Sequence, residues 1–195
     1  MFLLRKPDDE AIRRFIGSRE SLPFSYEEVG ATRVGATPGG YVADRYRVKL
    51  GEGEDAYRRA ADALRDWRQF GLGWTSLRPL RAPIEEGSVV AVLVRHLGFR
   101  SLNPARIVYT LDDRGPLQRF GFAYGTLPGH SEKGEELFSI EWNRADGSGE
   151  GSVHYAVFAF SRPDHPLSWL GYPFTRMLQK RFIRDSQRAM VEACR

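Results

Sequence analysis

Apolar side chains occupy alternate positions on both sides of a short polar loop in the second half of the chain. The alternating residues are Phe120, Phe122 and Tyr124 before the loop, and Phe138, Ile140 and Trp142 after it. Successive side chains of a β-strand point to opposite faces, so this period of two predicts two antiparallel strands that share one aromatic face. Such a face can form a wall of a cavity.

The loop between these strands concentrates ionisable groups: His130, Glu132, Glu135 and Glu136 lie within seven positions. A histidine near a carboxylate can move protons, so His130, Glu132 and Glu135 are candidate catalytic residues. The same groups can instead gate a cavity, contact the polar part of a ligand, or form an ordinary hairpin loop in which Glu135 and Glu136 point to opposite faces. One histidine and three glutamates do not resemble a metal site, and we expect neither a metal nor a cofactor.

Hydrophobic periodicity extends the strand pattern over most of the chain. We expect strands over 45–50, 74–77, 88–97, 106–111, 117–126, 135–143 and 151–160. Turn residues such as Asn103-Pro104 separate them, and short connections favour antiparallel pairing. We expect three helices. The first begins at Pro7 and ends at Gly17, and the second runs over 54–70. Pro173 either opens the third after a turn around Pro166 or kinks a longer helix. This order predicts one antiparallel sheet with helices on one side and a long C-terminal helix.

Cysteine content and hydropathy indicate in which cellular compartment the protein is expected. The chain has one cysteine, Cys194, whereas a secreted domain more often carries an even set that forms disulfides. Only three apolar residues follow Met1 before the first charge, which is too few for a signal peptide. No apolar stretch approaches the roughly 20 residues of a membrane span. We therefore expect a cytoplasmic protein without a transmembrane segment.

The positive charge of the chain is concentrated in the predicted C-terminal helix. Between residues 173 and 195, six basic residues stand against two acidic ones, an excess equal to the net charge of +4 of the whole chain. These residues form either a solvated helix face or a surface for an anionic partner. We do not expect nucleic acid, because a nucleic-acid-binding protein usually carries basic residues on several elements.

Several segments resemble a family catalogued as a domain of unknown function, number nineteen-ninety. These segments are 45–54, 106–109, 120–138, 158–163 and 179–190, and the most specific is Tyr124-Gly-Thr-Leu-Pro-Gly-His-Ser-Glu-Lys-Gly-Glu-Glu136. The family is similar in layout to the helix-grip superfamily of START lipid-transfer domains, birch-pollen-type allergens and polyketide cyclases. The resemblance covers about Leu22 to Met190 and implies an apolar cavity beneath the C-terminal helix. It implies no particular reaction, since this fold hosts transport, sensing and catalysis.

These observations predict an α+β helix-grip (START-like) protein, in which a curved antiparallel sheet wraps around a long C-terminal helix. We expect a single domain over 1–195, with residues 1–43 as an N-terminal extension made of a short helix and an irregular segment. A cavity between sheet and helix would bind a small hydrophobic or amphipathic molecule. The expected ligand-binding residues are Phe122, Tyr124, Phe138, Trp142, Phe174 and Met177.

Two other functions remain open at this stage. One is a cyclase- or hydrolase-type enzyme that uses the same cavity, with His130 and Glu132 as acid and base. The other is binding of a partner or an anionic surface through the basic C-terminal helix. The sequence does not predict the ligand, whether turnover occurs, or the oligomeric state.

Overall fold

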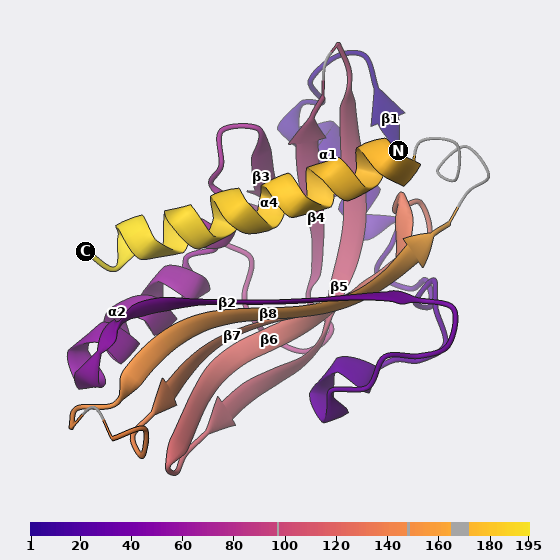
Figure 1. Cartoon of the computed structure of the whole chain (residues 1–195). Helices are drawn as coiled ribbons and strands as arrows, with labels where there is room; N and C mark the ends of the chain where they lie inside the picture. The colour runs from indigo at the N-terminus through magenta and orange to yellow at the C-terminus, as the bar shows by residue number, and fades with distance from the viewer. Residues whose placement is uncertain (97, 148, 165–171) are drawn as a thin grey trace.

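Eight strands in the computed structural model form one antiparallel sheet that curls around the C-terminal helix (Figure 1). The structure describes residues 1–96, 98–147, 149–164 and 172–195, so the predicted turn around Pro166 lies outside it. The strands are β1 (Phe2–Leu3), β2 (Val42–Glu52), β3 (Thr75–Arg78), β4 (Val89–Arg95), β5 (Arg100–Asp113), β6 (Leu117–Thr126), β7 (Glu132–Asn143) and β8 (Ser152–Pro163). The helices are α1 (Asp9–Gly17), α2 (Gly53–Arg65) and α4 (Tyr172–Ala193), with short 3₁₀ turns η1 (Ala31–Val34) and η2 (Arg68–Phe70).

The sheet follows the order β2-β8-β7-β6-β5-β4-β3, and β1 pairs with β5. All of these pairings are antiparallel. Phe122 of β6 lies opposite Phe138 of β7, which confirms the predicted aromatic hairpin. The curled sheet and the long helix α4 lying across its concave face give the expected α+β helix-grip layout (Figure 1).

The predicted turn at Asn103-Pro104 is wrong, because both residues lie inside the long strand β5. Proline has no backbone N–H, so it is tolerated only where the ladder needs no donor. The Pro104 carbonyl accepts a hydrogen bond from the Leu127 N–H at 3.1 Å, just beyond the end of β6. The N–H and the carbonyl of a strand residue point to the same side, so the missing N–H would face a position where β6 has already ended. The strand expected over 106–111 therefore starts earlier and has 14 residues, Arg100–Asp113.

Local chemistry fixes the ends of the first two helices. The side chain of Asp8 accepts a hydrogen bond from the Ala11 N–H at 2.7 Å and caps α1, so Pro7 precedes the cap and does not open the helix as predicted. The second helix ends at Arg65, earlier than the predicted 70, because Trp67 adopts a left-handed backbone conformation with φ of 56°. The chain then continues as η2.

Helices cover both faces of the sheet, and the expectation of helices on one side only is wrong for α1. Ile12 and Phe15 of α1 pack against Ala91, Leu93 and Leu102, on the face that points away from α4. On the concave face, α2 and η2 contribute to the main hydrophobic core together with residues of α4. None of the helices in the described ranges has the length and hydrophobicity needed to span a bilayer.

Candidate ligand-binding site

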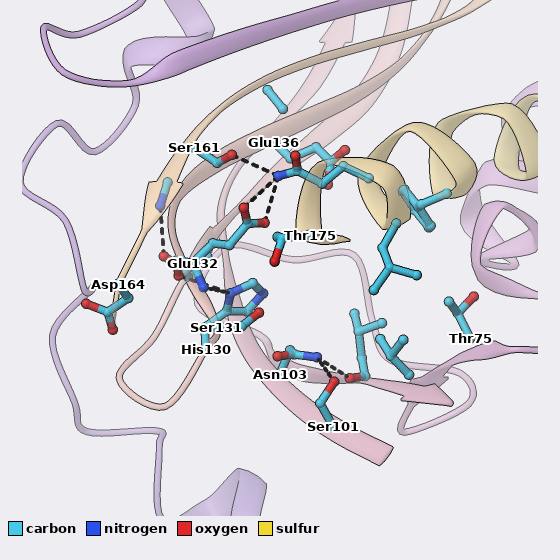
Figure 2. Close-up of a pocket in the computed structure, with 18 of the residues that line it drawn as sticks. Thr75, Ser101, Asn103, His130, Ser131, Glu132, Glu136, Ser161, Asp164 and Thr175 are labelled. Carbon is cyan, nitrogen blue, oxygen red and sulfur yellow. Dashed lines mark hydrogen bonds between the residues drawn. The ribbon is translucent and has the colours of Figure 1, made fainter. Parts of the chain in front are cut away.

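A cavity with a volume of about 700 Å³ lies between the concave face of the sheet and the first half of α4 (Figure 2). The rest of the concave face is filled, because aromatic side chains of α2, η2 and the residues between them pack onto the strands. The packed ring pairs are Trp67 with Phe122 (4.6 Å between centroids), Phe70 with Phe138 (5.6 Å) and Tyr57 with Trp142 (5.7 Å). The position of α2 therefore decides which half of the sheet borders open space.

One part of the cavity wall is apolar. Its side chains come from η2, the segment between η2 and β3, β4, the β4–β5 turn and α4, and include Phe70, Trp74, Val92, Val94, Phe99, Leu178, Phe182 and Ile183. Polar side chains gather elsewhere, and Figure 2 shows Glu132, Glu136 and Ser161 grouped near the start of α4. A cavity of this size with an apolar wall and a few converging polar groups is typical of a small-molecule site.

A chain of hydrogen bonds across three elements holds the carboxyl group of Glu132. The Gln179 amide of α4 donates to both Glu132 oxygens, at 2.7 and 2.8 Å. Arg176 donates to the Gln179 carbonyl at 2.7 Å and forms a two-point ion pair with Asp44 of β2. The Arg176 contact turns the Gln179 NH₂ group toward Glu132, so α4 and β2 together set the position of this carboxyl group.

The carboxyl groups of Glu132 and Glu136 both have raised pKa values. Burial raises the pKa of Glu132 to about 7, although the hydrogen bonds from Gln179 and the charge of Arg176 oppose this shift. Burial also raises the pKa of Glu136 to about 7, against the hydrogen bond that Tyr124 donates at 2.8 Å and with a contribution from the charge of Glu132. About half of each group is therefore ionised at pH 7.

His130 lies at the cavity wall, but its contacts are with the backbone. Its Nδ1 accepts a hydrogen bond from the Glu132 N–H at 3.0 Å, and burial lowers the pKa of His130 to about 4. The ring is therefore neutral at pH 7 and fixes the loop before β7. Among the described residues, no hydrogen bond joins the His130 ring to the carboxyl group of Glu132, the pair suggested as acid and base.

A second polar group borders the cavity from β4 and β5. The Asn103 amide donates to Ser101 Oγ at 3.0 Å, and Ser101 Oγ is 2.9 Å from His96 Nε2. Ser101 and Asn103 are buried, and Figure 2 shows both beside the cavity. Asn103 Oδ1 and His96 Nδ1 are buried without a hydrogen-bond partner in the described part of the chain. Asn103 Oδ1 can therefore accept a bond from a ligand, and His96 Nδ1 can accept or donate one, depending on its tautomer.

Glu135 points to the other face of β7, as the strand alternation predicts. Its carboxylate accepts hydrogen bonds from the Tyr26 hydroxyl at 2.6 Å, the Gly30 N–H at 2.7 Å and the Thr32 N–H at 3.0 Å, and a further one from the Thr32 hydroxyl. The side chain is 2 % exposed. It anchors the N-terminal segment, so the structure gives this catalytic candidate a packing role.

The expected ligand-binding residues divide into two groups. Tyr124 and Phe174 line the cavity. The other four need correction: Phe122, Phe138 and Trp142 lie in the packed core under α2 and η2, and Met177 lies on the outer side of α4, where it is 54 % exposed. Alternation identified the correct face of the strands, but it cannot show which part of that face another helix covers.

Other residues of the site were not identified from the sequence. Asp44, Gln179, His96 and Asn103 line the cavity, yet they lie far apart in the chain. Only the i, i+3 spacing of Arg176 and Gln179 on one helix offered a signal. Within the described residues, no cluster of three His, Cys, Asp or Glu side chains is arranged to hold a metal ion.

The basic residues of α4 are partly neutralised within the protein. Arg176 pairs with Asp44, and Arg181 and Arg184 both approach Asp185 at 3.4 Å. These contacts reduce the charge that the helix offers to an anionic partner, because an ion pair presents less net field than an isolated arginine.

Comparison with known proteins identifies relatives by sequence and by fold. The chain is 38% identical over 207 residues to a UPF0548 protein of Dictyostelium discoideum, covering 99% of this chain and 95% of the relative. It is 37% identical over 206 residues to a UPF0548 protein of Deinococcus radiodurans, covering 99% and 98%. The crystal structure of a hypothetical protein from Helicobacter pylori, jhp0584, is similar with a TM-score of 0.51 at 10% identity, covering 89% of this chain and 96% of that one. The family model described as "Domain of unknown function (DUF1990)" matches residues 25–189, and the chain therefore belongs to the DUF1990 family.

Proposed function

We propose that this protein binds a small amphipathic molecule in the cavity between the sheet and α4. The observation that carries the proposal is the cavity itself: about 700 Å³ of space bordered by an apolar wall and by a separate set of polar groups. This volume lies within the range of about 300–1,000 Å³ usual for small-molecule sites. A purely apolar ligand would leave Glu132, Glu136 and Asn103 without hydrogen-bond partners for their remaining capacity.

The placement of the two kinds of wall suggests how the ligand lies. Its apolar part would pack against Leu178, Phe70 and Phe182, the last two of which are in contact with 5.2 Å between ring centroids. Its polar part would lie near Glu132 and Glu136. Burial of each methylene of the ligand contributes about 0.8 kcal/mol, so a chain of several carbons supplies most of the binding free energy.

Filling the cavity tests the proposal. Leu178 and Met177 are neighbours on α4, but only Leu178 lines the cavity. We expect Leu178→Trp to weaken binding of a co-purified or added amphipathic molecule at least about tenfold, because the indole occupies ligand volume. Met177→Trp, on the exposed side of the same helix, is the matched control and should bind like the wild-type protein.

Native mass spectrometry of both variants and of the wild-type protein, followed by extraction and identification of small molecules, gives the readout. Equal ligand occupancy in Leu178→Trp and Met177→Trp would count against the cavity as the binding site. Thermal unfolding of the two variants shows whether a loss of ligand reflects loss of the fold.

A second candidate function is a cyclase- or hydrolase-type enzyme, and the raised pKa values favour it. A carboxyl group with a pKa of about 7 can both accept and donate a proton at neutral pH, and Glu132 and Glu136 both meet this condition. His130 does not, because its pKa is lowered to about 4. Once a ligand is identified, conversion by the wild-type protein and its loss in Glu136→Gln with retained binding would support turnover. An unconverted ligand would contradict it.

We further propose a cytoplasmic location and an organisation in which residues 1–43 form an extension on a helix-grip domain. The single cysteine supports the first, and fractionation of host cells tests it. The four hydrogen bonds to Glu135 support the second, since their donors all belong to residues 26–32. The Glu135 variants described in the Discussion test how strongly this segment is attached.

A further inference from the structure

The cavity has a charge opposite to that of the protein. The chain carries 29 Lys and Arg against 25 Asp and Glu, and yet no Lys or Arg is among the described residues that line the cavity. Five acidic residues contribute atoms to the cavity lining, although not all with their carboxyl groups: Asp44, Glu132, Glu135, Glu136 and Asp164.

Three of these five acidic residues are compensated by groups of the protein. Asp44 is paired with Arg176, and Asp164 with Lys133 at 2.8 Å. Glu135 turns to the opposite face of the sheet, where four donors hold it. Glu132 and Glu136 remain, and neither forms an ion pair with a cation in the described part of the chain.

The other ionisable groups around the cavity do not neutralise this pair. The amino group of Met1 donates to the carbonyl oxygens of Leu102 and Gly129, each at 2.9 Å, so its hydrogen bonds are made elsewhere. Burial lowers the pKa of both His130 and His96, which keeps these rings neutral at pH 7.

An independent observation points to the same kind of ligand. Asn103 is 6 % exposed and lines the cavity, and its Oδ1 has no donor within the described structure. The amide orientation is set by the neighbours of its nitrogen, Ser101 Oγ at 3.0 Å and the Val92 carbonyl at 3.4 Å. A buried acceptor without a donor is costly, and a ligand that donates hydrogen bonds would satisfy it.

We propose that the polar group of the ligand is a cation, an ammonium group on an apolar chain, that binds to Glu132 and Glu136 at the cavity wall. This inference rests on the proposed function, because it names the chemical class of the molecule bound in the same cavity. An ammonium group carries positive charge and several N–H donors but no acceptor. It is therefore complementary to two carboxyl groups and an amide oxygen, whereas a carboxylate or phosphate would be repelled.

Because the two carboxyl groups ionise near neutral pH, amine binding should depend on pH. With pKa values of about 7, each group is about one-tenth ionised at pH 6 and about nine-tenths at pH 8, while an alkylammonium remains charged. The amine should therefore bind about tenfold tighter at pH 8 than at pH 6 if one carboxylate is needed, and up to about 100-fold tighter if both are.

The direction in which other groups near Glu132 and Glu136 affect amine binding is known. Asp44 and Arg176 are paired with each other beside Glu132, and Tyr124 stays protonated over this range, since burial raises the Tyr124 pKa well above its usual value. Burial lowers the pKa of the Met1 amino group, and loss of its charge would change amine binding in the same direction. Only the glutamate variants separate these two contributions.

The test uses three octyl compounds that differ only in the polar group: octylamine, octanol and octanoate. Binding to the full chain is measured by isothermal titration calorimetry at pH 6, 7 and 8, in buffers of different ionisation enthalpy so that proton release is counted. The variants are Glu132→Gln, Glu136→Gln and the double variant, which keep side-chain volume. The matched control is Glu141→Gln, on the same strand but on the outer face, where Glu141 pairs with Arg47 at 3.2 Å.

At pH 8 we expect octylamine to bind the wild-type protein at least about tenfold tighter than octanol, with octanoate weakest. At pH 6, where both carboxyl groups are mostly protonated, octylamine binding should release protons. The double variant should lose this preference and the pH dependence, and Glu141→Gln should keep both. Octanoate binding as tightly as octylamine, or an amine preference that survives in the double variant, would overturn the inference and leave the proposed function standing. If none of the three compounds binds, the proposed function fails as well. The pH series on the wild-type protein needs no substitution, so it tests the inference even if a variant does not fold.

Discussion

Replacing Glu135 with alanine should detach the N-terminal segment from the sheet. Glu135 Oε1 and Oε2 accept hydrogen bonds from four donors of Tyr26, Gly30 and Thr32, and Glu135, Tyr26 and Thr32 are all buried. A hydrogen bond to a charged group contributes about 1.5–3 kcal/mol, and each buried donor left without an acceptor costs about 1–3 kcal/mol.

These contributions do not add fully, because some donors find new partners. The Thr32 hydroxyl is already 2.7 Å from the Tyr109 hydroxyl and can donate there instead. We therefore expect Glu135→Ala to lower the free energy of unfolding by about 3–5 kcal/mol, the range measured when one partner of a buried charged network is removed. For a chain of this length, this corresponds to a fall in Tm of about 6–20 °C. Glu135→Gln keeps one acceptor oxygen and should lose about half as much.

Urea denaturation followed by circular dichroism measures the free energy, and hydrogen exchange of the Gly30 and Thr32 amides locates the effect. Glu136→Gln is the control, since Glu136 is the next residue on the same strand and faces the cavity. At pH 8 it should be neutral or stabilising, because it removes a carboxyl group that burial makes costly to ionise. A loss below about 1 kcal/mol in Glu135→Ala, or unchanged amide exchange, would refute the role assigned to Glu135.

Three other outcomes follow from the site and the core. Trp142→Ala should lower the free energy of unfolding by about 3–5 kcal/mol, as for other buried aromatic side chains, and should leave octylamine affinity unchanged. Weaker octylamine binding without a loss of stability would show that Trp142 contacts the ligand. Because the pKa values of Glu132 and Glu136 are raised on folding, their contribution should favour the folded state most near pH 4.5 and be lost as pH rises through about 7. We expect the free energy of unfolding to fall by about 1–3 kcal/mol per group over this pH range. If the Glu132→Gln/Glu136→Gln variant loses as much stability as the wild-type protein, these residues are not the cause. Gln179→Leu removes donors from Glu132 and should raise its pKa further, measured by ¹³C NMR titration of the side-chain carboxyl carbons; a lowered or unchanged value would contradict the link.

Prediction from the sequence failed where local signals and long-range pairing disagree. Asn103-Pro104 has the composition of a turn, but β5 runs past the end of β6 there, and a missing N–H does no harm. The apolar spacing of residues 54–70 suits one helix, but the chain turns at Trp67, and this turn lets Trp67 and Phe70 pack on the sheet. In both cases the tertiary contact outweighs the local preference.

Features that depend only on neighbouring residues could be predicted from the amino-acid sequence. Alternation placed Phe122 and Phe138 on one face and sent Glu135 and Glu136 to opposite faces, because side chains alternate along any extended strand. The tertiary structure alone decided what each face meets. The packing of α2 closes half of the concave face, and α4 brings Arg176 and Gln179 to Asp44, 132 positions before Arg176, and to Glu132. Such contacts depend on sheet curvature and helix placement, which no local period encodes, and they create the cavity, its acidic character and the raised pKa values of its two carboxyl groups.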